Sequence, residues 1–208
     1  MTFLKHNHVS LRQLSDKTLA FLVSLLLVFV LAAPFAPATT VLAENTSSHK
    51  SSVTDEPKLT EATTAIVTDA QGNVLWSKNP DQELPMASIT KVMTAIVALD
   101  SGVNLDEPCE ITVPDLEEGS QVAGLTADDT PTLRQLIMMM LIYSANDAAY
   151  NIAINVSGSQ QPFVDQMNKK AAEIGMTHTQ FQNPHGLDAN GHYSTARELA
   201  LMGRYARE

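Results

Sequence analysis

The spacing of hydrophobic residues divides the sequence into a strand region and a helical region. In the first, two short runs of residues that favour β-structure, 64–69 and 74–77, flank a Gly-Asn turn. Such a pattern predicts a β-hairpin. In the second, apolar residues recur at intervals of three and four from Ser88 to about Asp100. That period predicts an amphipathic helix.

Helical patterns continue through the second half of the chain. Thr132 and Gln135 form a capping-box pair, and the run that follows, 133–143, is apolar on nearly every face, so we expect it to be buried. A loop is predicted at 181–191, where turn-forming pairs are frequent. Three more helices are predicted between capping and stop residues: about 147–157, about 162–174 before Gly175, and a last one that Thr195 and Glu198 cap.

Strands at the start and helices in the middle indicate an α/β or α+β domain. Among the remaining residues, only Glu110–Val113 has a strand-like pattern. A few short strands cannot cover so many helices, and an isolated hairpin is only marginally stable. We therefore expect a domain whose sheet is incomplete in this chain, unless further strands lie elsewhere in it.

The first 43 residues have the pattern of a secretory signal. Three basic residues precede fifteen uncharged, mostly apolar residues at 19–33, and small residues end at Ala43. The pattern predicts export to the periplasm or the outer face of the membrane, with cleavage after Ala43. An uncleaved anchor is the alternative, but fifteen residues fall short of the roughly 20 that cross a bilayer. Residues 44–60 are polar and predict a flexible linker, so the folded domain is expected over 61–208.

Composition and charge exclude several classes of protein. The chain has 13 basic and 23 acidic residues and a net charge of −10, which argues against nucleic-acid binding through a basic patch. The single cysteine, Cys109, cannot form an internal disulfide, and no Cys/His cluster has zinc-site spacing. Residues 100–130 contain nine acids and no Lys or Arg, which is typical of a solvated loop region. An acidic metal site is the alternative, but the calcium-loop spacing is missing.

Ser88 and Lys91 are the first candidates for chemistry. Three residues apart at a helix start, they project from nearly the same face. The helix dipole would stabilise negative charge that develops on the hydroxyl oxygen. A desolvated lysine beside it can become neutral and accept the serine proton. The alternative is a serine that caps the helix with an exposed lysine one turn later, and the spacing is compatible with both.

Ser144 and Asn146 form the second candidate pair. They interrupt two apolar helices, where buried polar groups are costly unless they are hydrogen-bonded. Both side chains could reach one site only from a turn, because positions two apart on a helix point to different sides. The alternative is a plain helix-breaking connection.

Other common catalytic patterns are missing or weak. The sequence has no Gly-x-Ser-x-Gly, no Gly-rich phosphate loop and no His-Glu-x-x-His. The acidic segment around Cys109 would raise the pKa of its thiol and disfavour the reactive thiolate. His185 lies between Asn-Pro and Gly, and we expect it to tie its loop together rather than to act in catalysis.

Several motifs in order resemble the serine D-alanyl-D-alanine carboxypeptidases of the S11 peptidase type, which are low-molecular-mass penicillin-binding proteins. The resemblance covers about 61–208 and implies a β-lactamase/transpeptidase-like fold, with a helical subdomain beside a central antiparallel sheet. The motifs are Pro-Met-Ala-Ser-Ile-Thr-Lys-Val-Met-Thr-Ala at 85–95, Tyr-Ser-Ala-Asn-Asp-Ala-Ala at 143–149, Asn-Pro-His-Gly-Leu-Asp at 183–188 and His-Tyr-Ser-Thr-Ala-Arg-Glu at 192–198.

The resemblance implies a role for each candidate residue. Ser88 would be the nucleophile, with its backbone N–H as an oxyanion donor, and Lys91 would be the general base. Ser144 would relay a proton towards the leaving D-alanine, and Asn146 would bind the substrate backbone or Lys91. Substrates would be peptidoglycan stem peptides that end in D-Ala-D-Ala, and β-lactams would acylate the same serine. No metal or organic cofactor is implied.

One family motif has no counterpart here. The Lys-Thr-Gly strand that follows the His-Gly-Leu-Asp loop is missing, since the only Lys-Thr pair is at 17–18. We therefore expect an incomplete or truncated sequence, and the alternative function is a non-enzymatic remnant that binds peptidoglycan or penicillin. An open reading frame past Glu208 with Lys-Thr-Gly would favour the enzyme. A class A β-lactamase is a further alternative, but its Glu-x-x-x-Asn pattern does not occur.

Overall fold

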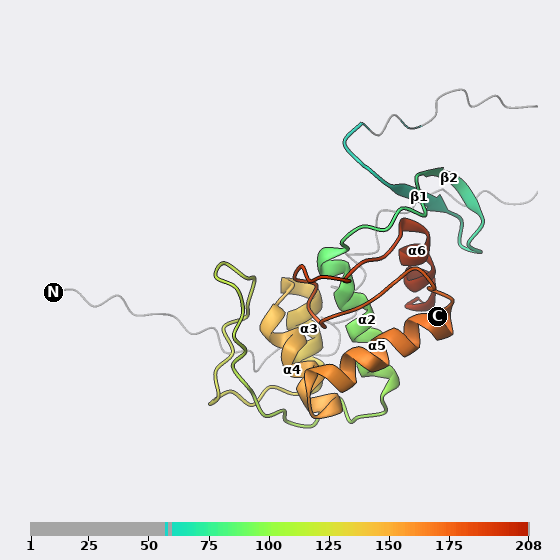
Figure 1. Cartoon of the computed structure of the whole chain (residues 1–208). Helices are drawn as coiled ribbons and strands as arrows, with labels where there is room; N and C mark the ends of the chain where they lie inside the picture. Colours follow the sequence, from blue (N-terminus) through green and yellow to red (C-terminus); the bar gives the residue numbers. More distant parts are fainter. Residues whose placement is uncertain (1–56, 58–59, 208) are drawn as a thin grey trace, which may run out of the picture. The chain divides into compact units, whose positions relative to one another are not determined.

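The computed structural model describes residue 57 and residues 60–207. The predicted signal over 1–43 and most of the predicted linker over 44–60 lie outside these residues. Figure 1 shows a β-hairpin followed by a group of helices. The elements are β1 (Ala65–Thr68), β2 (Val74–Lys78), the 3-10 turn η1 (Ala87–Ile89), α2 (Thr90–Asp100), α3 (Leu133–Tyr143), α4 (Asn146–Ser157), α5 (Gln160–Ile174) and α6 (Ala196–Tyr205).

The predicted hairpin is confirmed. β1 and β2 pair antiparallel, with Val67 opposite Trp76 and a bulge after Val67. The turn between them is closed by Asp69, whose carboxylate accepts the backbone N–H groups of Gln71 at 2.9 Å and Asn73 at 2.8 Å. An aspartate that binds the backbone two residues on is a common way to fix a turn. Within residue 57 and residues 60–207, these two strands form the only sheet.

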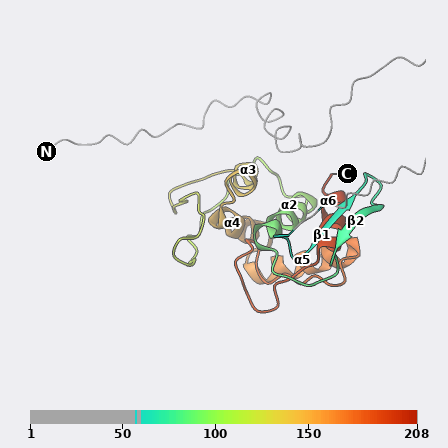
Figure 2. The ribbon, with the colours of Figure 1, turned by 90° about the horizontal axis from the view of Figure 1, so that it is seen from above.

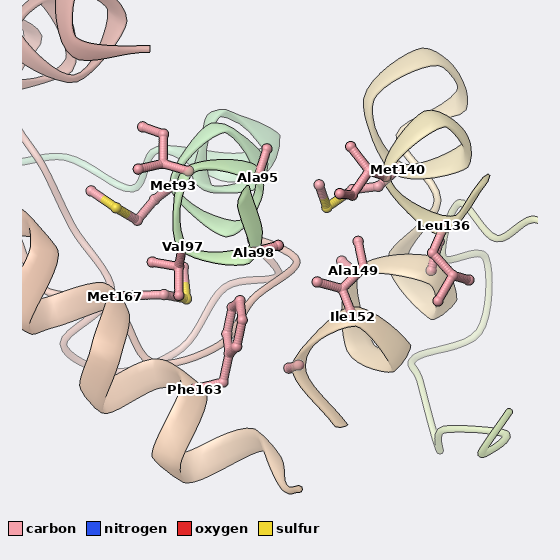
Figure 3. Packing of buried hydrophobic residues seen from close by; sticks show 14 of the residues in the cluster. Met93, Ala95, Val97, Ala98, Leu136, Met140, Ala149, Ile152, Phe163 and Met167 are labelled. Atoms are coloured by element: carbon pink, nitrogen blue, oxygen red, sulfur yellow. The ribbon is translucent and has the colours of Figure 1, made fainter. Parts of the chain in front are cut away.

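Helix α2 is the centre of the helical part. In the views of Figures 1 and 2 it lies between α3 and α4 on one side and α6 on the other, and it also packs against α5. Figure 3 shows Val97 directed towards Phe163 and Met167 of α5, while Met140 and Ala149 approach from α3 and α4. Burying each such large side chain stabilises the fold by about 1.5–3 kcal/mol.

Two predictions about the middle of the chain are wrong. Glu110–Val113 is not a strand, because its backbone is paired with side chains of α4 instead of another strand. Helix α3 is not buried on nearly every face: Ile142 and Tyr143 are 59% and 56% exposed in its last turn. The helix packs on α4 and α2 along one side only, through Leu133, Leu136, Ile137 and Met140.

The other helices begin close to the predicted positions. The helix predicted from Ser88 opens with the turn η1 before α2 begins at Thr90, and α5 begins at Gln160, two residues before Pro162. A proline is tolerated at this third helical position because the first-turn N–H groups have no intrahelical partner. Among the described residues, no helix combines the length and hydrophobicity needed to cross a bilayer.

Long-range contacts bring two later segments beside the start of α2. Leu84 and Ser194 exchange both backbone hydrogen bonds, at 2.9 and 3.0 Å, and Gln180 pairs with Tyr193 in the same way. We call residues 183–192 the His loop, and residues 101–132, between α2 and α3, the acidic connection. Both lack helices and strands. The pairing at Leu84 holds the segment that leads into η1, and so it positions Ser88.

Candidate active site

Ser88 is exposed on the turn η1, directly before α2. The preceding residue, Ala87, has a φ of +47°, in the left-handed region that L-residues other than glycine seldom adopt. Gly186 of the His loop lies against it, with a φ of +90°, and a Cβ on Gly186 would collide with the Ala87 carbonyl group. The turn that carries Ser88 therefore packs against Gly186, at a position where a side chain would not fit.

Lys91 lies one turn along the same face. Its Nζ donates to Ser88 Oγ at 3.0 Å and to the His185 carbonyl oxygen at 2.6 Å, and the residue is 3% exposed. Burial lowers the pKa of Lys91 to about 8, because the charged ammonium group loses hydration. At pH 7 roughly one molecule in ten then carries a neutral amine, far more than for an ordinary lysine. The neutral amine can accept the Ser88 proton across the same 3.0 Å contact, with the hydroxyl group as donor and Nζ as acceptor.

Ser144 completes a three-residue cluster. It ends α3 in a left-handed conformation, with φ 59° and ψ 31°, and its Oγ donates to Ser88 Oγ at 3.0 Å. The Ser88 oxygen thus accepts two hydrogen bonds, one from Ser144 and one from Lys91. The polar interruption after α3 is a turn at Ser144, which both interpretations of the sequence allow, and Asn146 already belongs to α4. The structure therefore brings together three of the four candidate residues by direct contact.

Asn146, the fourth candidate, begins α4 two residues after Ser144. It is buried, and its backbone N–H donates to the Gln121 carbonyl oxygen at 2.8 Å. The contact joins the acidic connection to the turn that carries Ser144. Asn146 therefore lies at the edge of the cluster, linked to a segment that sequence reasoning treated as a solvated loop.

Buried histidine His192 also supports the site, and sequence reasoning did not single it out. Its Nδ1 accepts the N–H of Gln182 at 3.0 Å, so its proton is on Nε2 and is donated to Thr90 Oγ1, 2.8 Å away. Burial lowers the pKa of His192, which keeps the ring neutral. This ring fixes the start of α2 next to Lys91. No short-range pattern could reveal it, because 102 residues separate the partners.

His185 contributes its backbone to the site and its ring to the loop. The carbonyl group accepts from Lys91, while ring Nδ1 accepts the Leu187 N–H at 3.2 Å. Burial, followed by the charge of Lys91, lowers the ring pKa to about 4. Asn183 Oδ1 accepts the N–H groups of His185 and Gly186, at 3.2 and 2.7 Å. These contacts fit the expectation that His185 ties its loop together.

The acidic connection shows little chemistry of its own. Cys109 is buried, and its thiol pKa is raised, first by burial and then by Glu107. The direction is as expected, although burial is the larger cause. In the part of the chain that the structure describes, no group of three or more His, Cys, Asp or Glu side chains could hold a metal ion. The chemistry that the geometry supports is nucleophilic attack by an activated serine.

Comparisons with known proteins support this interpretation. Residues 50–208 match the S11 peptidase family, described as D-alanyl-D-alanine carboxypeptidase. Over 187 residues the chain is 33% identical to the D-alanyl-D-alanine carboxypeptidase DacF of Bacillus subtilis. The aligned region covers 88% of this chain and 46% of that protein. The chain spans about half the length of the curated relatives it matches.

Solved structures agree with the sequence matches. Penicillin-binding protein 6B from Escherichia coli superposes with a TM-score of 0.68 at 29% identity, over 74% of this chain and 52% of that one. Penicillin-binding protein D2 from Listeria monocytogenes, in its cefotaxime-bound form, gives 0.63 at 31% identity, over 70% and 61%. These likenesses confirm the β-lactamase/transpeptidase-like fold. Since family match, fold and motif order agree, this chain belongs to the D-alanyl-D-alanine carboxypeptidase family of S11 serine peptidases.

Proposed function

We propose that this protein is a serine-type D-Ala-D-Ala carboxypeptidase that removes the terminal D-alanine of peptidoglycan stem peptides through an acyl-enzyme on Ser88. The observation that carries the proposal is the buried Lys91 amine, 3.0 Å from the Ser88 hydroxyl oxygen, with a pKa lowered to about 8. A base with a pKa near the working pH is efficient because it is partly neutral and still basic enough to take the proton.

Acylation follows from this pair. Ser88 Oγ attacks the carbonyl carbon of the penultimate D-alanine while its proton moves to neutral Lys91 Nζ. The carbonyl electron pair moves to oxygen, where the Ser88 backbone N–H would donate to the oxyanion. Preorganised donors of this kind often contribute the largest share of the rate. The His185 carbonyl group then stabilises the new ammonium group, because it already accepts from Nζ at 2.6 Å.

Collapse of the intermediate requires a proton on the departing amine. Ser144 Oγ, 3.0 Å from Ser88 Oγ, would pass a proton to the nitrogen of the leaving D-alanine and recover one from Lys91. The peptide C–N bond breaks and the ester with Ser88 remains. Water then hydrolyses the ester, with Lys91 as base, and restores the free hydroxyl. In this scheme Asn146 would bind the substrate backbone at the entrance to α4.

β-Lactams belong to the same proposal as acylating inhibitors of Ser88. One matching structure, the Listeria penicillin-binding protein, is a cefotaxime-bound form. A β-lactam amide opened by Ser88 gives an ester whose leaving nitrogen stays tethered, so the adduct persists. This makes a fluorescent penicillin a probe of the nucleophile that does not depend on fast turnover.

The test is covalent labelling with a fluorescent penicillin, followed by peptide mapping. Prolonged incubation should attach one label to the peptide that carries Ser88, and Ser88→Ala should abolish it. Ser77→Ala, which removes an exposed hydroxyl on β2, is the matched control and should label normally. Release of D-alanine from a peptide ending in D-Ala-D-Ala then tests the carboxypeptidase step. Labelling that survives Ser88→Ala would contradict the assignment.

Export is part of the proposal. The basic start, the apolar run at 19–33 and the small residues before Glu44 support a secretory signal over 1–43 and a linker over 44–60. The enzyme would then work outside the cytoplasmic membrane, where peptidoglycan lies. Amino-terminal sequencing of the exported protein should start at Glu44. A chain that still starts at Met1 would instead indicate an anchor.

A further inference from the structure

Three polar side chains form a stripe along α4, spaced four residues apart: Asp147, Asn151 and Asn155. All three bind the backbone of the acidic connection, which lies beside α3 and α4 in Figure 1. Four helical residues advance about 6 Å, close to the 6.6–6.8 Å of two extended residues, which agrees with the two-residue spacing of Glu110 and Thr112 opposite Asn155 and Asn151.

The two asparagines hold the acidic connection at Glu110 and Thr112. Asn155 accepts the Glu110 N–H at 3.2 Å and donates to its carbonyl oxygen at 2.9 Å. Asn151 does the same with Thr112, at 2.8 and 2.9 Å. Each side-chain amide thus pairs with one backbone N–H group and one backbone carbonyl group, as a residue of a neighbouring strand would. These contacts lie away from Ser144, towards the carboxyl end of α4.

Asp147 binds differently and lies next to the site. Its Oδ1 accepts the N–H of Ala123 at 2.8 Å, and its Oδ2 accepts those of Gly124 at 2.9 Å and Leu125 at 3.0 Å. Oδ1 also accepts the N–H of Ala148 in the first turn of α4, where the helix dipole favours negative charge. Asp147 is 4% exposed, so these four donors replace the hydration of its carboxylate.

We call the contacts of Asp147 with 123–125 the clamp. Asn146, the residue before Asp147, connects the clamp to the turn that carries Ser144. Asn146 donates its backbone N–H to the Gln121 carbonyl oxygen at 2.8 Å, and Ser144 Oγ is 3.0 Å from Ser88 Oγ. The segment 121–125 is therefore fixed to the entrance of α4 at both of its ends. Resting on the proposed function, we propose that Asp147 is a positioning residue: it fixes 121–125 as a wall of the substrate site beside Asn146, so that the bound acyl group is aligned for attack by Ser88.

The number of donors explains why a carboxylate is needed at this position. Each of the two carboxylate oxygens of Asp147 accepts two backbone N–H groups. An asparagine has nearly the same shape but only one acceptor oxygen, so in either orientation its NH2 group would face two backbone donors. Asp147→Asn should therefore release 121–125 while it changes little else. Asn155→Ala is the matched control, since it loosens the same connection about 12 Å further along the helix.

The test measures acylation by a fluorescent penicillin in the full chain, with the acylation rate constant separated from the dissociation constant for the first complex. Asp147→Asn should lower the rate constant roughly 10- to 100-fold, because small misplacements of reacting groups have effects of this size. Ser88 should remain the labelled residue. Asn155→Ala should stay within about twofold of the unmodified protein, although both variants lower the melting temperature.

Two results would overturn the inference: normal acylation by Asp147→Asn, or an equal loss in Asn155→Ala, which would indicate a merely structural clamp. If the unmodified protein is never labelled, the proposed function fails and the inference fails with it. Hydrogen exchange on the unmodified protein covers the case in which the variant does not fold. The amides of Ala123, Gly124 and Leu125 should be protected, and protection no greater than that of the exposed turn at 117–119 would contradict the clamp.

Discussion

Two segments without regular secondary structure adjoin the cluster of Ser88, Lys91 and Ser144, and the helices hold these segments in different ways. The His loop is held through close packing and buried rings, with Gly186 against Ala87 and His192 against Thr90. The acidic connection is held through the polar side chains of α4. The first segment contacts the Lys91 amine, whose pKa is lowered by burial, through the His185 carbonyl group, whereas the second contacts the backbone of Asn146. An irregular segment can thus control either the electrostatics or the shape of a site, according to what it contacts.

Among changes in the two segments, Gly186→Ala in the His loop should have the largest effect on acylation. The new Cβ would collide with the Ala87 carbonyl group and displace the turn that presents Ser88. We expect acylation to fall roughly 100-fold or more, measured with a fluorescent penicillin.

Gly175→Ala is the control for that change. Gly175 has a φ of +92°, almost that of Gly186, but no atom lies within 4 Å of the position that a Cβ would take, so only the cost of the left-handed backbone remains, about 1–2 kcal/mol. An equal loss of acylation in both variants would show that backbone strain, rather than the contact with Ala87, is responsible.

The pH dependence of acylation tests the electrostatic role of the His loop. Only the neutral amine of Lys91 can accept the proton, and the neutral fraction rises steeply with pH below the pKa of about 8 and approaches one above it. The rate of Ser88 acylation should therefore rise about tenfold per pH unit from pH 6 to 7 and level off above about pH 8.5. A flat profile across this range would contradict the assignment of Lys91 as the base.

A smaller effect is expected where His192 meets Thr90. Thr90→Val leaves the buried Nε2–H of His192 without its acceptor, and His192→Ala leaves the Gln182 N–H without one. Each should lower the free energy of unfolding by about 1–3 kcal/mol in urea denaturation. The double variant should lose about 1 kcal/mol less than the sum of the two, and strict additivity would argue against the hydrogen bond.

The smallest effect on acylation is expected in the acidic connection far from Asn146. Asn151→Ala leaves the N–H and carbonyl groups of Thr112 without their partner. Thermal unfolding should show a loss of about 1–3 kcal/mol. Asn151 also donates to the Asp147 carbonyl oxygen, but acylation of the folded protein should change less than twofold, because the Asp147 carboxylate keeps its own contacts with 123–125. A large loss of acylation would mean that the two segments are not separable in function.

Local features of the fold could be predicted from the sequence. The hairpin, the helices and the Thr132 cap depend on residues a few positions apart, and the cap forms both of its bonds, at 2.8 and 3.3 Å. The contact of Ser88 with Lys91 was predictable for the same reason, since one helical turn separates them. Their catalytic roles stay predictions, as do those of Ser144 and Asn146.

The remaining features depend on residues that are far apart in the sequence. The β-branched residues of Glu110–Val113 suggested a strand, but the partner of this segment is a helix, which no strand pattern can indicate. Nothing near Ala87 indicates that Gly186 packs behind it. The sequence does carry one signal for the polar contacts of α4: Asp147, Asn151 and Asn155 recur every four residues on a helix that is otherwise mostly apolar, which indicates a polar stripe along one face.

The central claim is that a buried, partly neutral Lys91 activates Ser88, and an NMR titration of the Lys91 side chain tests it most directly. With the lysine carbons labelled with 13C, and Lys91→Arg used to assign its signal, the Cε resonance should titrate with a midpoint near pH 8. The midpoint should coincide with that of the acylation profile. A midpoint near the ordinary lysine value of about 10.4 would contradict the account, because almost no neutral amine would then be present at pH 7.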